Sequence, residues 1–184
     1  MVSRVKPAKI ETSVFAGLNV AGACIIAATA AFVAITDAAI GTNNAVAGEP
    51  AVLTVMANGT EPAATLSMAE LEAMPQTTIS TSTIWTEGTH TLTGVALSDF
   101  LTSVNLSGAS IQAVALNDYS VSIPVADAVE GGPIIAHRMD GEAMSVRDKG
   151  PLWIVYPYDS KREYRTEVIY SRSIWQLNQM RVED

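Results

Sequence analysis

The longest hydrophobic pattern in the chain is an uncharged run from Thr12 to Thr36, bounded by Glu11 and Asp37. A helix of roughly 25 residues, rising about 1.5 Å per residue, would reach about 37 Å, which is enough to cross a bilayer with some tilt. The pattern therefore predicts one transmembrane helix at residues 12–36, preceded by a short segment at residues 1–11.

Basic residues near this run lie on one side only. Arg4, Lys6 and Lys9 precede it, and no Lys or Arg follows until Arg138. By the positive-inside rule, we expect the N-terminus in the cytoplasm and the C-terminal domain in the periplasm, with a single pass through the cytoplasmic membrane. A signal peptide cleaved after Ala47 is the alternative. Because signal h-regions usually run about 7–15 residues, the longer run favours an uncleaved anchor.

Small residues are frequent in the predicted anchor. Gly17 and Ala21 lie four positions apart, and Asn19 stands between them. A small-xxx-small step lets two helices approach closely in lipid, and a buried amide prefers a partner there. The pattern is typical either of an ordinary alanine-rich anchor or of a helix that docks onto other transmembrane subunits.

Residues 37–50 predict a linker, because Gly41, Gly48 and Pro50 interrupt any periodicity. Residues 51–184 then alternate strand-like and helix-like patterns, and their length suffices for one domain with a hydrophobic core. We therefore expect a single α+β domain after the anchor and linker.

Alternating and β-branched patterns predict strands at Ala51–Ala57, Thr77–Trp85, Thr89–Thr93, Ile111–Leu116, Tyr119–Ile123, Pro133–Met139, Ala143–Val146, Leu152–Tyr156 and the final run to Val182. The turn pairs Glu87-Gly88, Asn117-Asp118 and Asp140-Gly141 predict hairpins. Helical spacing predicts helices at Leu66–Met74, with Ser67 and Glu70 as a capping box, and at Val95–Val104, while Pro124 can begin a short helix that reaches Ala128. Val168–Leu177 fits a helix, a strand or a loop.

Charge is unevenly distributed over this domain. From Glu49 to His137 there are nine acidic residues and no Lys or Arg, whereas eight basic and eight acidic residues follow from Arg138 onward. This balance argues against binding to nucleic-acid phosphates. An acidic surface suits a basic soluble protein as partner.

Few residues of the domain are typical of catalysis. The only cysteine, Cys24, lies inside the predicted anchor, so the domain has no thiolate ligand and no internal disulfide. His90 and His137 lack the spacing of a metal pair, and no nucleophile-elbow, Walker or dinucleotide-binding pattern occurs. We expect no metal site.

Five motifs follow one another between Val52 and Val182: Leu92-Thr93-Gly94 continuing to Leu101, Asn117-Asp118-Tyr119, Arg138 to Met144, Gly150 to Pro157, and Ser173 to Leu177 with its continuation to Val182. In this order they resemble the motifs of the sulfite-oxidase-like oxidoreductase molybdopterin-binding domains. The resemblance implies a sulfite-oxidase-type fold, with mixed sheets and short helices. It also implies molybdopterin as the cofactor, if the chain binds any.

The positions that hold the cofactor in that family differ here. Thr81-Ser82 corresponds to the stretch that carries the molybdenum-binding cysteine, and Leu92 replaces the tryptophan of its W-x-G motif. Trp153 replaces an arginine that helps to hold the pterin phosphate, and Ile174 replaces a lysine. Because a hydroxyl is a poor substitute for a thiolate, the resemblance implies a divergent member that lacks the metal ligand.

Two functions follow from this comparison. In the first, the domain binds no cofactor and is a binding or accessory subunit of a membrane complex, with a remnant pocket formed by Thr81, Ser82, Trp85, Arg138, Trp153 and Arg172. In the second, it is an active molybdopterin-dependent oxidoreductase, with Ser82 or Thr81 as an oxygen ligand and with Arg138, Arg172 and Arg147 on the phosphate. Because such catalysis needs the metal, which the protein mainly positions, we favour the first.

Overall fold

The structure, a computed structural model, describes residues 49–57 and 62–184. The predicted segments at residues 1–11 and 12–36, and the linker as far as residue 48, lie outside the described residues. Within the described part of the chain, no helix combines the length and the apolar character needed to cross a membrane.

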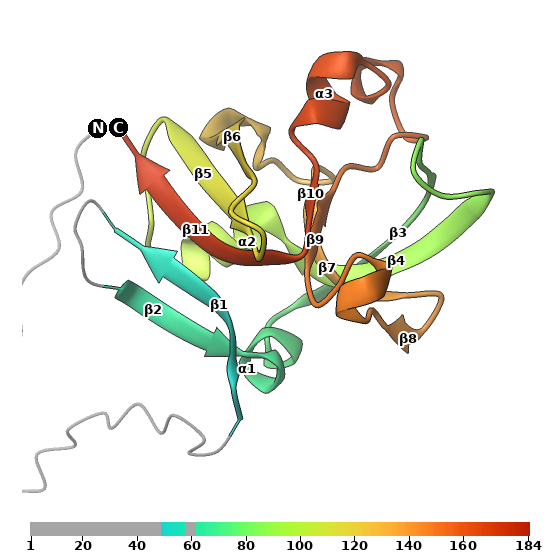
Figure 1. Cartoon of the computed structure of the whole chain (residues 1–184). Coiled ribbons are helices and arrows are strands. Elements are labelled where there is room, and N and C mark those ends of the chain that lie inside the picture. Colours follow the sequence, from blue (N-terminus) through green and yellow to red (C-terminus); the bar gives the residue numbers. More distant parts are fainter. Residues whose placement is uncertain (1–48, 58–61) are drawn as a thin grey trace, which may run out of the picture. The chain divides into compact units, whose positions relative to one another are not determined.

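Strands of the described residues form two sheets (Figure 1). The first has the order β2 (Pro62–Ser67), β1 (Ala51–Met56), β11 (Leu177–Glu183), β5 (Ser110–Ala115) and β6 (Ser120–Pro124). The second has the order β10 (Ile174–Trp175), β9 (Trp153–Val155), β7 (Ile134–Met139), β4 (Thr89–Ala96) and β3 (Gln76–Ser82), and β8 (Glu142–Ala143) pairs with β7. The β1–β11 pair is parallel, with Thr54 opposite Gln179, and the other pairs are antiparallel.

Short helices connect these strands. They are the α-helices α1 (Met68–Ala73), α2 (Leu97–Ser103) and α3 (Glu167–Ser171) and the 3-10 turns η1 (Val125–Asp127), η2 (Val146–Asp148) and η3 (Arg162–Tyr164). This combination of two sheets with a few short helices confirms the predicted α+β class.

Local signals in the sequence are confirmed at the start of α1. The Ser67 hydroxyl accepts the backbone N–H of Glu70 at 3.3 Å, and the Glu70 carboxylate accepts the backbone N–H of Ser67 at 2.8 Å. The bond from the Ser67 backbone N–H, and a second one from the Ser67 hydroxyl to the same carboxylate oxygen at 2.9 Å, lower the pKa of Glu70 below its usual value. The helix begins two residues later than predicted, because Leu66 pairs with Leu53 as part of β2.

Strand pairing also corrects other boundaries. The sequence pattern did not predict β2. The helix expected from Val95 begins at Leu97, because Val95 pairs with Ile135 in the β4–β7 ladder. The strand expected at Ala143–Val146 ends at Ala143, where its pairing with β7 stops. Val168–Leu177 contains the end of α3, all of β10 and the start of β11. The three predicted hairpins, β3–β4, β5–β6 and β7–β8, are confirmed.

Strands β7 and β9 of the second sheet are buried on both faces. Ile154 of β9 belongs to a large hydrophobic cluster that draws side chains from both sheets and from α2, whereas Trp153 and Val155 belong to a second cluster. Neighbouring residues of a strand point to opposite faces. Burial on both sides therefore explains why the sequence around β9 is continuously apolar rather than alternating.

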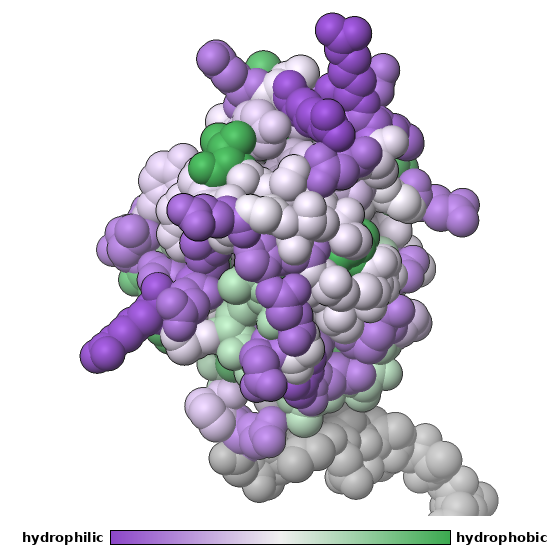
Figure 2. All heavy atoms as spheres, turned by 90° about the vertical axis from the view of Figure 1, so that its right-hand side faces the viewer, coloured by the Kyte–Doolittle hydropathy of each residue, from purple (hydrophilic) through white to green (hydrophobic). Residues whose placement is uncertain are grey.

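The outer surface shown in Figure 2 is mainly polar, and its hydrophobic side chains form small separate patches. Such scattered apolar residues are ordinary on protein surfaces. On this face, the described residues form no broad hydrophobic surface.

Gly94, the glycine of the first family-like motif, lies where β4 and β7 approach closely. A bulge shifts the register between Thr93 and Gly94. A Cβ atom added at Gly94 would lie 2.0 Å from the backbone oxygen of Ile135 and 2.6 Å from Cα of Ala136. Both obstacles are backbone atoms, so a larger residue would force the two strands apart.

We expect Gly94→Ala to destabilise the domain by about 1–3 kcal/mol or more, since overpacking against backbone cannot be relieved by a rotamer change. Urea unfolding of the full chain, followed by tryptophan fluorescence, measures this. Thr91→Ala, at an exposed position of the same strand, is the control and should change stability by about 0.5 kcal/mol or less. Equal stability of the two variants would contradict the close approach.

Candidate functional site

The predicted metal-ligand position lies at the end of β3, where its polar atoms already have partners. Ser82 donates its backbone N–H to Asp159 Oδ2 at 2.6 Å and its hydroxyl to Asp159 Oδ1 at 3.0 Å. Thr81 is fully buried, and its hydroxyl accepts the backbone N–H of Asp159 at 3.1 Å and donates to Ser82 O at 3.2 Å. These bonds join the end of β3 to the loop that follows β9.

Asp159 is stabilised as a carboxylate in this arrangement. The two hydrogen bonds from Ser82 are the main cause of its lowered pKa, and the nearby Arg165 guanidinium lowers the pKa further. Arg165 Nη2 lies 3.0 Å from Asp159 Oδ1, and its Nε–H donates to Tyr158 O at 3.0 Å. Charge-assisted bonds of this kind are stronger than neutral ones, so Asp159 fixes the two segments to each other.

The two arginines predicted in the pocket are paired with carboxylates elsewhere. Arg138 Nη2 lies 2.7 Å from Glu72 Oε1 on α1. Arg172 Nη1 lies 2.7 Å from Asp127 Oδ2 in η1, and the same oxygen accepts the Tyr156 hydroxyl at 2.7 Å. The two guanidinium groups therefore lie in separate ion pairs, one at α1 and one at η1.

Two buried tyrosines fix the segment around α3 and β10. Burial raises the pKa of Tyr156, and its bond to Asp127 raises it further. Burial likewise raises the pKa of Tyr158 to about 12, and the hydroxyls of Tyr158 and buried Ser173 are hydrogen bonded to each other. Both phenols stay protonated at neutral pH, so they serve as hydrogen-bonding parts of the core.

The two histidines have structural partners. His137 is buried, and its Nε2 is 2.8 Å from Gln76 Oε1. Burial lowers the pKa of His137 most, and Arg138 lowers it as well, while Glu72 has the opposite effect. His90 Nδ1 lies 2.6 Å from Asp140 Oδ2, which joins the β3–β4 hairpin to the β7–β8 turn. Each ring thus holds neighbouring elements together.

Three tryptophans pack at the edge of the second sheet. Trp153 is fully buried, and its Nε1–H has no hydrogen-bond partner among the described residues. Trp175 lies directly opposite it in the β9–β10 pair, on the same face. Trp85 packs edge-on against both, with ring centroids 6.1 Å from Trp153 and 5.6 Å from Trp175. The expected strand Thr77–Trp85 is thus too long: β3 ends at Ser82, where Asp159 binds it, and Trp85 lies in the following loop.

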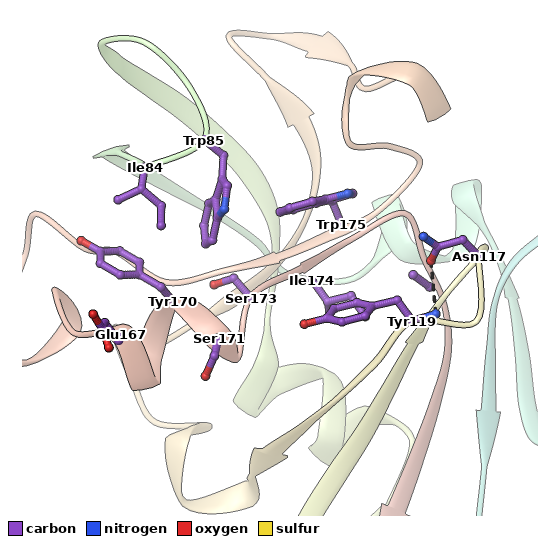
Figure 3. A pocket seen from close by; sticks show the side chains of 11 residues that line it. Ile84, Trp85, Asn117, Tyr119, Glu167, Tyr170, Ser171, Ser173, Ile174 and Trp175 are labelled. Atoms are coloured by element: carbon purple, nitrogen blue, oxygen red, sulfur yellow. Dashed lines mark hydrogen bonds between the residues drawn. The ribbon is translucent and has the colours of Figure 1, made fainter.

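A pocket of about 540 Å³ opens beside Trp85 and Trp175. Figure 3 shows its side chains: Trp85 and Ile84 from the β3–β4 loop, Tyr170 and Glu167 from α3, Tyr119 from the β5–β6 turn, and Trp175 from β10. Tyr119 is held at the turn by its backbone N–H, which donates to Asn117 Oδ1 at 3.2 Å. The walls therefore combine four aromatic side chains with aliphatic and neutral polar ones, and they come from four separate segments.

Trp175 reaches the pocket because the chain changes sheets immediately after it. Gln176 has φ of 55° and separates β10 of the second sheet from β11 of the first. Its side-chain amide donates to Val146 O at 2.7 Å, and its backbone N–H donates to Lys149 O at 3.1 Å. This fixed bend leaves the Trp175 ring 37% exposed at the pocket wall.

A second, smaller pocket adjoins the first. Its lining includes Trp85 and Trp175 again, together with Arg147, Lys149 and Gln176. The Lys149 ammonium lies 5.8 Å from the ring centroid of Trp153, within cation–π range. The two pockets thus share Trp85 and Trp175, while Arg147 and Lys149 line the second one.

Of the six residues predicted to form a remnant pocket, Trp85 lines the aromatic pocket. Trp153 lies behind it, Thr81 and Ser82 bond to Asp159, and Arg138 and Arg172 lie in separate ion pairs. The sequence reasoning missed Tyr119, Tyr170 and Trp175 as pocket residues. Each is an aromatic residue in an uninformative position: Tyr119 follows a predicted turn, and the other two lie in the segment Val168–Leu177, whose structure the pattern left undecided.

Residues 46–159 match the family model of the oxidoreductase molybdopterin binding domain. The chain belongs to this family. The predicted resemblance is therefore confirmed over more than half of the chain. No curated protein matches the chain. The match ends at Asp159, so Glu167, Tyr170 and Trp175 of the aromatic pocket lie beyond it.

The family's cofactor is molybdopterin, but the residues of this member do not fit it. Thr81 and Ser82 offer hydroxyl oxygens that are already bonded to Asp159, in place of a free thiolate. Of the three arginines expected on the phosphate, Arg138 and Arg172 pair with Glu72 and Asp127, whereas Arg147 lines the smaller pocket. Trp153, which the motif resemblance aligns with the family's phosphate-binding arginine, is a fully buried indole. Ligand binding by this chain therefore needs a different explanation.

We expect Asp159→Asn to destabilise the domain by about 1–3 kcal/mol at neutral pH, because the amide replaces one of the two accepting oxygens by an NH2 group, which cannot accept. The pKa of Asp159 is lowered in the native state, so its stabilisation is complete above about pH 4, the usual carboxyl pKa, and is lost as pH falls through the lower native pKa. Urea unfolding at several pH values should show the difference from wild type shrinking below about pH 4.

Glu130→Gln, which removes an exposed carboxylate in the loop after η1, is the matched control. Its effect should be small throughout the same pH range. A penalty for Asp159→Asn that stays constant down to pH values below the native pKa would contradict the assigned role of the ionised carboxylate.

Proposed function

We propose that this protein is a binding subunit that keeps the molybdopterin-binding fold without using molybdopterin. The observation that carries the proposal is the set of hydrogen bonds between Asp159 and the Thr81-Ser82 pair, which occupies the position of the metal ligand. Trp153 supports it, because its ring fills the core where the family has a cation. The aromatic pocket beside Trp85 is then the binding site of the domain.

The proposal includes a location and a setting. The uncharged run at residues 12–36 anchors the protein in the cytoplasmic membrane, with the N-terminus in the cytoplasm and the domain in the periplasm. Gly17 and Ala21 dock this helix onto other transmembrane subunits of a complex. The acidic first half of the domain recruits a basic soluble protein.

The test of the lost cofactor is the molybdenum and pterin content of the full chain purified from its native membrane. We expect molybdenum far below one atom per chain and no pterin fluorescence after oxidation, because no free thiolate is available. A family member that carries the cysteine, purified in parallel, is the control for cofactor supply. Stoichiometric molybdenum that is lost in Ser82→Ala would overturn the proposal and establish an oxidoreductase with oxygen ligation.

The docking of the anchor is tested by co-purification. Replacing Gly17 and Ala21 together by leucine should release the protein from its membrane partners while leaving it in the membrane, since bulky residues keep the helices apart. The matched control replaces Ala23 and Ala27 by leucine, which lie on a different face of the predicted helix. Co-purification that survives the first pair and the second equally would count against this interface.

A further inference from the structure

We propose that the aromatic pocket binds a quaternary-ammonium cation, with Trp85, Tyr119, Tyr170 and Trp175 as its walls. The inference deepens the proposed function and rests on it, since it names the class of ligand for the same site. It is carried by the arrangement of the rings, by the charge of the lining and by the size of the pocket.

The rings are arranged as adjoining walls. Trp85 meets Trp175 with 5.6 Å between centroids and an interplanar angle of 69°. It meets Tyr170 at 5.9 Å and 86°. Figure 3 shows Tyr119 on the side of the pocket away from Tyr170, with Ser173 and Ile174 between them. A cation held among such rings meets the negative potential of several π systems at once.

The lining carries the complementary charge. Among the described residues that line the pocket, Glu167 is ionisable as an anion and there is no Lys or Arg. The chain from Glu49 onward is also acidic overall, because the nine carboxylates between Glu49 and His137 are accompanied by no Lys or Arg. Long-range attraction therefore favours a cationic ligand over an anionic one.

A quaternary cation fits this lining better than a primary amine. It has no N–H donors to satisfy, and its methyl groups spread the charge over an apolar surface, so it leaves water easily for an aromatic wall. A primary ammonium is strongly hydrated and would require acceptors on several sides. The pocket offers four aromatic side chains and the side chain of Ile84, with Glu167 as its single anion. Its three neutral polar side chains already have partners: Asn117 Oδ1 accepts the Tyr119 N–H, the Ser171 hydroxyl donates to Val168 O, and the Ser173 hydroxyl is bonded to Tyr158.

An anionic ring compound, which could also stack on the aromatic walls, fits the pocket less well than a quaternary cation. Its charge would require a cation, and the cations nearby, Arg147 and Lys149, line the adjoining pocket instead. The volume of about 540 Å³ exceeds that of a trimethylammonium group alone, so the bound molecule carries more than its cationic head. A choline-type headgroup, either of a lipid or of a free molecule, meets both conditions.

The test measures binding of choline to the full chain in a detergent that lacks quaternary ammonium groups, by calorimetry and tryptophan fluorescence at constant ionic strength. Saturable choline binding is expected, and its uncharged isostere 3,3-dimethylbutanol should bind at least about tenfold more weakly, as loss of a desolvated cation–π contact predicts. Phosphatidylcholine vesicles, compared with phosphatidylglycerol vesicles, form the second arm. Binding to phosphatidylcholine vesicles identifies a membrane headgroup as the source, and choline binding without binding to these vesicles identifies a free molecule.

Variants assign the binding to the pocket. Trp175→Leu and, separately, Tyr119→Leu should weaken choline binding about five- to thirtyfold, whereas Trp175→Phe should retain most of it. Trp175 and Tyr119 are 37% and 57% exposed, so both leucine variants should fold, which thermal unfolding checks. Glu167→Gln should weaken binding a few-fold in a salt-dependent way, and Glu130→Gln, an exposed carboxylate outside the pocket, should not.

Three outcomes overturn the inference: no choline or phosphatidylcholine binding, equal binding of the neutral isostere, or binding that the leucine variants leave unchanged. None of these outcomes bears on the proposed loss of molybdopterin, which the molybdenum and pterin assay tests separately. Stoichiometric molybdenum would overturn the proposed function even if choline bound as well.

Discussion

The connection between Asp159 and the end of β3 is the constraint on which the rest of this site depends. The Asp159 carboxylate accepts hydrogen bonds from the backbone N–H and the hydroxyl of Ser82, and Arg165 balances its charge. The backbone N–H of Asp159 donates to the hydroxyl of buried Thr81. A metal centre would need the same polar atoms exposed and unbonded. Because these polar atoms bond to one another, β3 ends at Ser82, and the loop that follows places Trp85 against Trp175 of β10.

The hydrogen bonds at the end of β3 also determine where the aromatic side chains pack. Trp153 adds a large apolar surface to the core on one face of the second sheet, at the cost of a buried N–H without a partner among the described residues. Trp85 covers Trp153 and adjoins Trp175, Tyr158 and Tyr170, so one side chain joins the core to the pocket wall. The chain belongs to the family of the oxidoreductase molybdopterin binding domain, and four aromatic side chains line the pocket beside Trp85.

Much of the fold could be predicted because its signals are local. Ser67 and Glu70 form their capping box within four residues, and the three hairpin turns lie between strands that are adjacent in sequence. β2 was missed because its pattern is weak and its pairing with β1 at a sheet edge defines it. For the site, the family motif directed attention to Thr81, Ser82 and Trp85, but the pairing of Ser82 with Asp159, 77 residues away, has no local signal.

By itself, the sequence determined the α+β class, the family and the absence of a thiol from the domain, since each depends on residue types and short spacings. Only the tertiary structure decided which polar groups satisfy one another and which rings form a pocket. Tyr119, Tyr170 and Trp175 come from three segments that meet only because Gln176 turns the chain from one sheet to the other. A pocket depends on distances between such segments, and no pattern along the chain encodes those distances.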